Sequence, residues 1–366
     1  MTSSPSPLIG NVASHRWWNR LAHRARAGLG LPSAVKSTIL SAGPGWSGAP
    51  GNHFDGRHFF NPGMAEDATS FRELLKWKLN GQAARWPDAV ANGHAPELPA
   101  ELRAGQAAVT FVNHATFLIQ LPGLNLLTDP VWSDRVSPVS WAGPKRIRPP
   151  GIVWDKLPRI DAVLLSHNHY DHWDTPTLRR LHERFRPQFI SGLGNAAFLE
   201  HLGIPGGEDL DWWETSGRVS RARIVFCPAR HWSNRGGGNR NTTLWGSFYI
   251  QQDRRKIYFG GDTGWHGHFQ EIRQKLGSPS LALLPIGAYE PRWFMASMHM
   301  NPAEAVQAHL ALGAELSLGM HYGTWQLTDE GLDDPVNDLK AACEAQGLPD
   351  GVFAPASHGK TVLADW

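Results

Sequence analysis

Hydrophobic and polar positions follow one pattern up to about residue 66 and another beyond it. In residues 14–27, arginines recur at every fourth position on one face of a predicted helix, and tryptophan and leucine lie on the opposite face. Residues 28–66 are rich in Gly, Pro and Ser, a composition that favours irregular chain. We therefore expect a basic, partly irregular N-terminal extension over residues 1–66 and a folded domain over residues 67–366.

The folded part is predicted to begin with a short amphipathic helix over residues 70–79, and apolar runs of strand length follow it. Residues 107–121 and 124–127 are separated by Pro122-Gly123, which predicts a hairpin. Later short apolar runs predict further buried strands at residues 162–165, 224–226, 245–250, 257–259, 281–286 and 316–320.

Two helices between these strands have recognisable starts. Thr175-Pro176 predicts an N-cap followed by proline, with a helix that runs to about His182. Asn301-Pro302 repeats the pattern, and Gly313 is the expected end of that helix. Strands that are mixed with helices in this way predict an α/β (α+β layered) fold, in which helices lie outside layers of sheet.

The composition excludes several classes of protein. Hydrophobic residues make up 41% of the 366 residues, which is enough for a core, and no apolar run approaches the roughly 20 residues of a membrane-spanning helix. Two cysteines, Cys227 and Cys343, are too few for a disulfide framework or a thiolate zinc site. The net charge of +2 argues against nucleic acid as a partner. The 18 histidines instead favour metal chemistry with imidazole and carboxylate ligands.

The charge is concentrated near the N-terminus, where residues 1–60 hold six basic residues and one acid. A basic helix with tryptophan on its apolar side suits an anionic membrane surface, and the alternative is a helix that packs on its own domain. The segment lacks the apolar stretch and cleavage site of a signal peptide. We expect a cytoplasmic location, with peripheral contact to a membrane if the first interpretation holds.

The densest chemistry lies directly after the predicted strand at residues 162–165. The motif there has the form His-x-His-x-Asp-His and consists of His167, His169, Asp171 and His172. Two histidines at positions i and i+2 project to the same side of an extended segment. Imidazole and carboxylate together suit zinc or a similar first-row metal.

Three further candidates follow other predicted strands, namely His231, Asp262 and His321. Each is weak alone, because a histidine at the end of a strand is ordinary. Together with the motif they make seven ligands, enough for two metal ions bridged by Asp262. The glycines Gly260 and Gly261 allow close approach of the backbone at a buried site.

This set of residues resembles the metallo-β-lactamase superfamily of binuclear hydrolases. The resemblance implies an αββα sandwich with two zinc ions at one edge. It implies that one ion is held by His167, His169 and His231 and the other by Asp171, His172 and His321, with Asp262 between them. The motif indicates fold and metal more than substrate, because this fold carries many hydrolytic activities.

Longer stretches resemble the phospholipase D family that hydrolyses N-acylphosphatidylethanolamines. They are residues 127–133, 143–146, 167–172 and 286–295, and a histidine, His299, before Pro302, Glu304, Ala305 and Val306. The family implies a zinc-dependent phosphodiesterase that releases N-acylethanolamine and phosphatidic acid. Asp171, Asp262 and His299 are the expected catalytic residues, and Tyr170 and His299 are the expected contacts to substrate. The sequence departs from the family at Asn113 and at residues 296–298.

Other polar residues have two interpretations. His114 and Asp129 either orient metal ligands or are ordinary polar residues near strand ends. Lys145, Arg146 and Arg148 either meet a phosphate head group or lie in a solvated loop.

Two functions therefore remain. The first is hydrolysis of a phospholipid at a membrane surface, and the alternative is hydrolysis of a small soluble ester or lactone at the same two metals. A binding protein with a degenerate site is disfavoured because all seven ligand positions are filled. The sequence indicates no protein partner, and it leaves a homodimer open.

Overall fold

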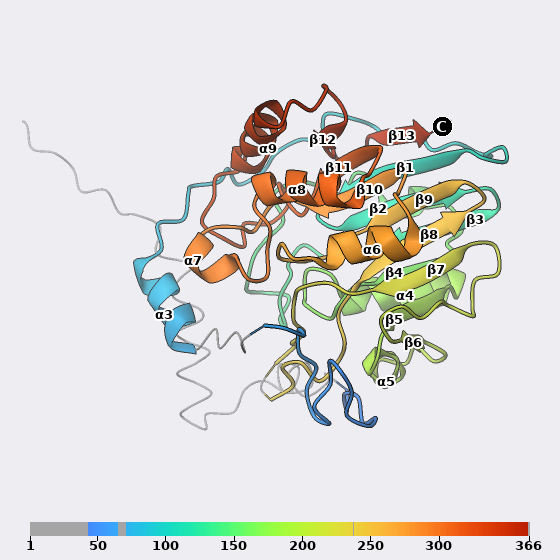
Figure 1. Ribbon diagram of the computed structural model, residues 1–366, viewed down its shortest axis with the longest axis horizontal. Helices are drawn as coiled ribbons and strands as arrows, with labels where there is room; N and C mark the ends of the chain where they lie inside the picture. The colour runs from blue at the N-terminus through green and yellow to red at the C-terminus, as the bar shows by residue number, and fades with distance from the viewer. Residues whose placement is uncertain (1–42, 65–70, 237, 365–366) are drawn as a thin grey trace, which may run out of the picture.

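The computed structural model describes residues 43–64, 71–236 and 238–364. Two sheets pack face to face, with helices on their outer sides (Figure 1). The predicted αββα sandwich is therefore confirmed. The predicted basic helix at residues 14–27 lies outside the described residues.

The first sheet consists of β1 (Ala107–Asn113), β2 (Thr116–Leu121), β3 (Leu124–Thr128), β4 (Ala162–Leu165), β5 (Gln188–Gly192), β6 (Glu208–Leu210) and β13 (Thr361–Ala364). Their order is β13-β1-β2-β3-β4-β5-β6. The pairs from β13 to β3 are antiparallel, and those from β3 to β6 are parallel.

The second sheet consists of β7 (Arg223–Cys227), β8 (Ser247–Gln252), β9 (Arg255–Phe259), β10 (Leu281–Pro285), β11 (Leu316–Met320) and β12 (Phe353–Pro355). Their order is β12-β11-β10-β9-β8-β7. The pairs from β12 to β9 are parallel, and β7, β8 and β9 form an antiparallel meander.

The helices are α3 (Phe71–Asn80), α4 (Thr175–Phe185), α5 (Asn195–His201), α6 (His268–Leu276), α7 (Arg292–Met295), α8 (Pro302–Leu312) and α9 (Asp334–Ala345), with a 3₁₀ turn at Trp154–Lys156. Figure 1 shows α4 and α5 beside β4, β5 and β6, and α6 and α8 against the second sheet. Apolar side chains of α4 and α5 pack on the outer face of the first sheet, and those of α6, α8 and α9 pack on the second.

The main core lies between the sheets. Phe117 and Leu126 reach it from the first sheet, and Phe226 and Phe248 reach it from the second. Residues 43–64, which form part of the expected extension, contain no regular helix and only an isolated bridge. They nevertheless bury Phe54 and Phe59 in this core, so they pack as part of the folded domain.

Most predicted strands are found with shifts of one or two residues, but the first hairpin is wrong in one respect. Residues 107–121 are not one strand, because the chain turns at His114 and Ala115 and forms β1 and β2. Every residue of both strands is buried, and the polar residues at the turn, Asn113 and His114, are buried as well, so the turn leaves no break in the pattern of burial. His114 makes the turn with a left-handed backbone, φ +48°.

The predicted helix starts are half right. Asn301 caps α8 with a full capping box to Glu304, and Gly313 ends that helix in the left-handed region. In α4 the N-cap is Asp174 rather than Thr175, and the helix continues past His182 to Phe185. The Asp174 carboxylate also binds the backbone N–H groups of Trp132 and Ser133, a tertiary contact that local sequence does not reveal.

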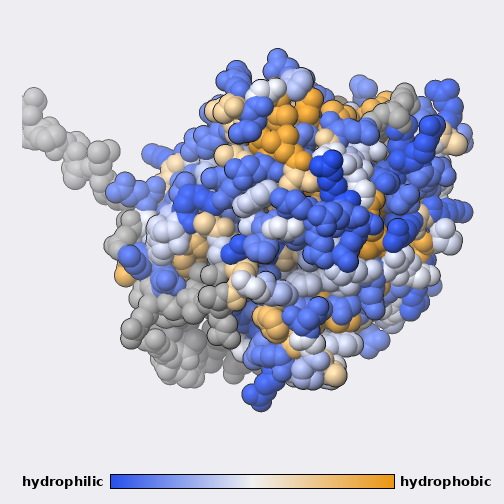
Figure 2. Space-filling view, viewed as in Figure 1, coloured by the Kyte–Doolittle hydropathy of each residue, from blue (hydrophilic) through white to orange (hydrophobic). Residues whose placement is uncertain are grey.

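No helix in the described part of the chain has the length and apolar character needed to cross a membrane. The face shown in Figure 2 is mostly hydrophilic, and its apolar residues form small separate areas.

Replacing Phe248 with alanine tests the core between the sheets. This ring is fully buried, and its centroid lies 5.0 Å from that of Phe226. We expect Phe248→Ala to lower the free energy of unfolding by about 3–5 kcal/mol, as measured by denaturant titration. Leu363→Ala, at a residue that is 62% exposed on β13, is the control and should change it by less than about 0.5 kcal/mol. Similar losses in both variants would contradict this assignment of the core.

Candidate metal centre

The seven predicted ligands meet at one edge of the sandwich. The histidines of the His-x-His-x-Asp-His motif follow β4, and His231, Asp262 and His321 follow β7, β9 and β11. The carboxyl ends of parallel strands are a common place for functional groups, since the loops that leave them converge there. Both sheets contribute, so the ligand set depends on their packing.

The first group consists of His167, His169 and His231. The Nδ1 atom of His169 lies 2.9 Å from Nε2 of His167 and 3.2 Å from Nε2 of His231. Two nitrogens that share one tetrahedral zinc ion are separated by about 3.3 Å, given zinc–nitrogen distances of about 2.0–2.1 Å. The three ring nitrogens therefore have the spacing of atoms that bind a common ion.

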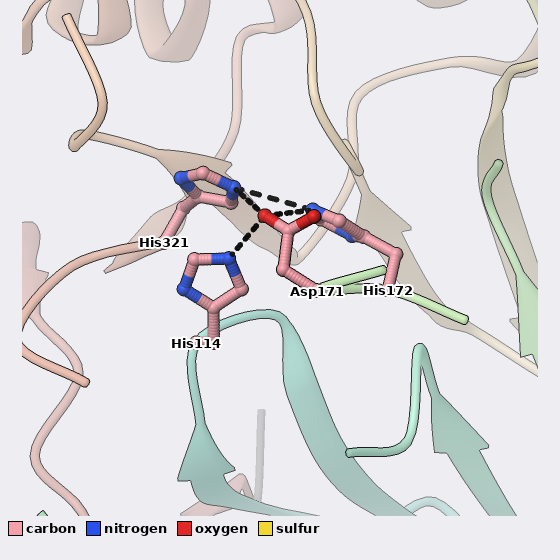
Figure 3. A group of neighbouring side chains, drawn as sticks. All are labelled: His114, Asp171, His172 and His321. Carbon is pink, nitrogen blue, oxygen red and sulfur yellow. Dashed lines mark hydrogen bonds and ion pairs between the residues drawn. The ribbon is translucent and has the colours of Figure 1, made fainter. Parts of the chain in front are cut away.

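The second group contains Asp171, His172 and His321, together with His114 (Figure 3). The Oδ2 atom of Asp171 lies 3.5 Å from Nε2 of both His172 and His321. These two Nε2 atoms are 3.2 Å apart. In Figure 3 the four side chains point toward one another from three separate segments of chain.

Asp262 lies between the two groups. Its Oδ2 atom is 3.2 Å from Nε2 of His172 and 3.8 Å from Nε2 of His231. Its Oδ1 atom is 3.0 Å from Nε2 of His321, yet it makes no hydrogen bond with any described residue. A buried carboxylate oxygen with no hydrogen bond, facing imidazole nitrogens, fits a metal ligand, so the residues present suit the ions that this donor set implies.

The charges of the site are strongly coupled. Burial by itself raises the pKa of Asp262, but the imidazoles of His172 and His321 hold that pKa well below its usual range. Burial by itself lowers the pKa of His321, but the carboxylates of Asp262 and Asp171 raise it to about 9. The carboxylates are thus held ionised, the state in which they bind cations.

Asp129 and His114 orient two of the ligands, as the first interpretation expected. The Asp129 Oδ2 atom lies 2.7 Å from Nδ1 of His172, which turns Nε2 of that ring toward the centre. Burial lowers the pKa of His114 to about 3, so its ring is neutral and its Nε2–H donates to Asp171 Oδ2 at 3.0 Å. Asp129 also accepts hydrogen bonds from the amide and hydroxyl of Ser166, beside His167.

Backbone conformation at this edge is unusual. His114, Asp129 and His321 have φ values of +48°, +33° and +67°, a region that residues other than glycine seldom occupy. Such residues cluster at functional sites, where the surrounding structure holds them. Gly261 has a φ of +56°, and a Cβ atom there would lie 2.7 Å from Cβ of Ser166, so the expected close approach is present.

His299 reaches the same centre from the chain between α7 and α8. Its Nδ1 atom is buried 3.9 Å from Asp262 Oδ2 and has no hydrogen-bond partner among the described residues. Its neighbours are fixed, because Nδ1–H of His231 donates to the carbonyl of Met298 and the amide of Met300 donates to that of Thr263. His299 is therefore placed beside both ligand groups.

The profile of the Beta-lactamase superfamily domain matches residues 124–322. The chain belongs to the metallo-β-lactamase superfamily. It is a metal-dependent hydrolase of this superfamily, with His and Asp clusters that can bind metal.

Individual relatives extend the likeness over most of the chain. It is 37% identical to an uncharacterized protein of Mycobacterium tuberculosis over 362 residues, 95% of this chain and 92% of that one. It is 39% identical to N-acyl-phosphatidylethanolamine-hydrolyzing phospholipase D 1 of Caenorhabditis elegans over 264 residues, 69% of this chain and 74% of that one. The solved metallo hydrolase Igni18 of Ignicoccus hospitalis has a TM-score of 0.53 at 23% identity, covers 71% of this chain and 99% of its own, and shows the shared fold.

Tyr170 and the arginines Arg146 and Arg148, which the sequence analysis singled out, make their contacts within the protein. The Tyr170 hydroxyl donates to the carbonyl of Arg235 at 2.6 Å. Arg146 is buried and donates to the carbonyls of Val131 and Ser133, and Arg148 donates to that of Gly323. The solvated-loop interpretation is therefore wrong for Arg146, because its buried guanidinium holds loops together, while Lys145 is exposed. Contact of this cluster with a phosphate head group stays a prediction.

Sequence reasoning missed Arg235, which is buried beside the ligand motif. It also gave no role to Ser166, although this residue directly precedes the motif. Nothing local marks Arg235, because its guanidinium donates to the carbonyls of residues more than 60 positions away.

Replacing Asp262 tests the paired site. Asp262→Asn keeps the shape of the side chain but removes the charge between the two groups, so we expect metal content to fall from two ions per chain to one or fewer. Elemental analysis after zinc-supplemented purification measures this. Asp253→Asn, at an exposed residue after β8, is the control and should keep two ions. One ion in the unmodified protein, or two in Asp262→Asn, would contradict a bridging carboxylate.

Proposed function

We propose that this hydrolase is a zinc-dependent phospholipase D that converts N-acylphosphatidylethanolamine to N-acylethanolamine and phosphatidic acid. The observation that carries the proposal is a set of seven candidate ligands, five of them buried, with His299 beside it, in a chain that aligns with 74% of the C. elegans phospholipase D 1. The M. tuberculosis relative has no activity in its name, so it adds no support for a substrate.

The residues that would hold the two zinc ions are His167, His169 and His231 for one, Asp171, His172 and His321 for the other, and Asp262 for both. Ions in such a site neutralise charge on phosphoryl oxygens and lower the pKa of water. The residues of the chain supply orientation: Asp129 fixes the ring of His172, and His114 fixes the carboxylate of Asp171.

The proposed reaction breaks the bond between phosphorus and the ethanolamine oxygen. A water oxygen bonds to phosphorus and gives up a proton, and the leaving oxygen takes one. His299 is placed to assist, because its buried Nδ1 is not committed to any hydrogen bond within the described chain. It either donates a hydrogen bond to a phosphoryl oxygen or passes a proton to the leaving oxygen.

Exposed apolar side chains near this edge support a lipid substrate. Trp293 is 55% exposed on α7, the short helix that leads into His299, and Leu74 and Leu79 of α3 are 39% and 67% exposed. The ring of Trp77 in α3 packs on Phe294 in α7, so the two helices form one surface. Together with the basic charge of residues 1–60, this surface supports peripheral contact with a membrane.

A parallel hydrolysis assay tests the substrate. The zinc-loaded full chain is given N-acylphosphatidylethanolamine in mixed micelles and, separately, a panel of lactones and small esters. We expect release of N-acylethanolamine and phosphatidic acid in equal amounts, measured by mass spectrometry, and no turnover by Asp262→Asn. Turnover of lactones without phospholipid hydrolysis would overturn the proposal in favour of the soluble-substrate alternative.

His299→Ala tests the proposed role of His299. Removing the ring should lower kcat roughly 10²- to 10⁴-fold, the range for a positioned acid or oxyanion donor, while zinc content stays at that of the unmodified protein. His201→Ala, at an exposed residue that ends α5, is the control and should leave kcat unchanged. Loss of zinc would make His299 a ligand or a structural residue, and an unchanged rate would rule out its role in catalysis.

A further inference from the structure

Arg235 is a buried cation next to the metal centre. The residue is 5% exposed. Its guanidinium donates to backbone carbonyl groups rather than to a carboxylate, and its Nε atom has no hydrogen-bond partner among the described residues. Burying a charge is costly unless it is compensated, so a structure retains such a group where its contacts matter.

Those contacts join the two ends of the ligand segment. One nitrogen, Nη1, donates to the carbonyl of Asn168 at 3.0 Å and to the carbonyl of Trp173 at 2.9 Å. The metal ligands His169, Asp171 and His172 all lie between these two carbonyls. The guanidinium of Arg235 therefore links the two ends of the ligand segment.

Backbone hydrogen bonds within the ligand segment also fold it into a tight turn. The amides of His172 and Trp173 donate to the carbonyl of His169 at 3.2 and 2.8 Å. Without a donor between them, the carbonyls of Asn168 and Trp173 would face the same buried space with no partner, which is unfavourable. This turn places His169 in the first ligand group and Asp171 in the second.

Tyr170 holds Arg235 in place. Its ring lies over the guanidinium at 4.0 Å, and its hydroxyl donates to the backbone carbonyl of Arg235 at 2.6 Å. Phe198 lies on the guanidinium as well, at 5.3 Å. Aromatic faces compensate part of the charge, so Arg235 is paired with rings and carbonyls in place of an acid.

We propose that Arg235 is a positioning residue that clamps the segment 168–173 in its metal-binding shape, with Tyr170 as the side chain that secures the clamp. The proposal rests on the metal site of the proposed function and is independent of the substrate. It gives Tyr170 a role inside the protein, whereas the place of Tyr170 in the ligand motif predicted contact with substrate.

Zinc affinity tests the clamp without any assay of turnover. The zinc-loaded full chain is titrated with a metal-chelating dye, and zinc release gives the dissociation constants. Arg235→Met keeps the length of the side chain but removes every donor, and we expect zinc binding to weaken roughly 10- to 100-fold, the usual effect of losing a group that orients metal ligands. Arg235→Lys keeps one hydrogen-bonding nitrogen but lacks the planar guanidinium, so its zinc affinity should fall by a smaller factor.

Arg180→Met is the matched control. Arg180 is exposed on α4, and its guanidinium stacks 3.9 Å from the ring of Trp154, away from the ligand segment. This variant also loses a cation–π contact and a charge, but it should bind zinc as the unmodified protein does. Weakening of the same size in Arg180→Met and Arg235→Met would overturn the proposal, since general loss of charge would then explain both.

Tyr170→Phe provides a second test that keeps the fold. It removes only the hydroxyl bond to Arg235, so circular dichroism should be unchanged while zinc affinity falls by a smaller factor than in Arg235→Met. If Arg235→Met does not fold, Arg235→Lys and Tyr170→Phe decide, and unmodified zinc affinity in both would overturn the clamp. Failure of the phospholipid assay together with the predicted loss of zinc would reject the substrate and leave the clamp intact.

Discussion

The rest of this structure depends on one constraint, the gathering of seven imidazole and carboxylate side chains, five of them buried, in one small volume. Ionisable groups lose their hydration when they are buried, so they must be paired with one another or with metal ions. Here the carboxylate of Asp262 faces His172, His231 and His321 within 4 Å. Two sheets, each contributing strand ends, bring these residues to one edge from segments that are far apart in the sequence.

Supporting hydrogen bonds hold three of these side chains in place. Asp129 fixes His172, His114 fixes Asp171, and the carbonyl of Met298 fixes His231. Two of these residues, His114 and Asp129, occupy the left-handed backbone region, which the protein tolerates because packed strands hold them there. The ordered sandwich therefore supplies the packing that keeps the strained residues at this edge in place.

The same geometry explains why the structure indicates the class of reaction more clearly than the substrate. The candidate ligands, His114 and Asp129 lie in loops that follow strands, whereas His299 lies between α7 and α8. Together with the family, this set of residues defines a metal-dependent hydrolase. Under the proposed function, substrate selection would depend on side chains farther from the metal centre, including the surface formed by α3 and α7. Relatives with this fold act on different compounds, so fold alone does not choose among them.

The sequence by itself determined the chemistry that is local along the chain. The His-x-His-x-Asp-His motif, the apolar runs of β4, β10 and β11, and the capping residue of α8 are each written in a few consecutive positions. The tertiary structure alone decided the turn at His114, the partners of Asp129, the inward use of Arg146 and the clamp by Arg235. Their roles come from contacts between residues that are distant in sequence, and a hydrophobic pattern records burial without recording which buried residues meet.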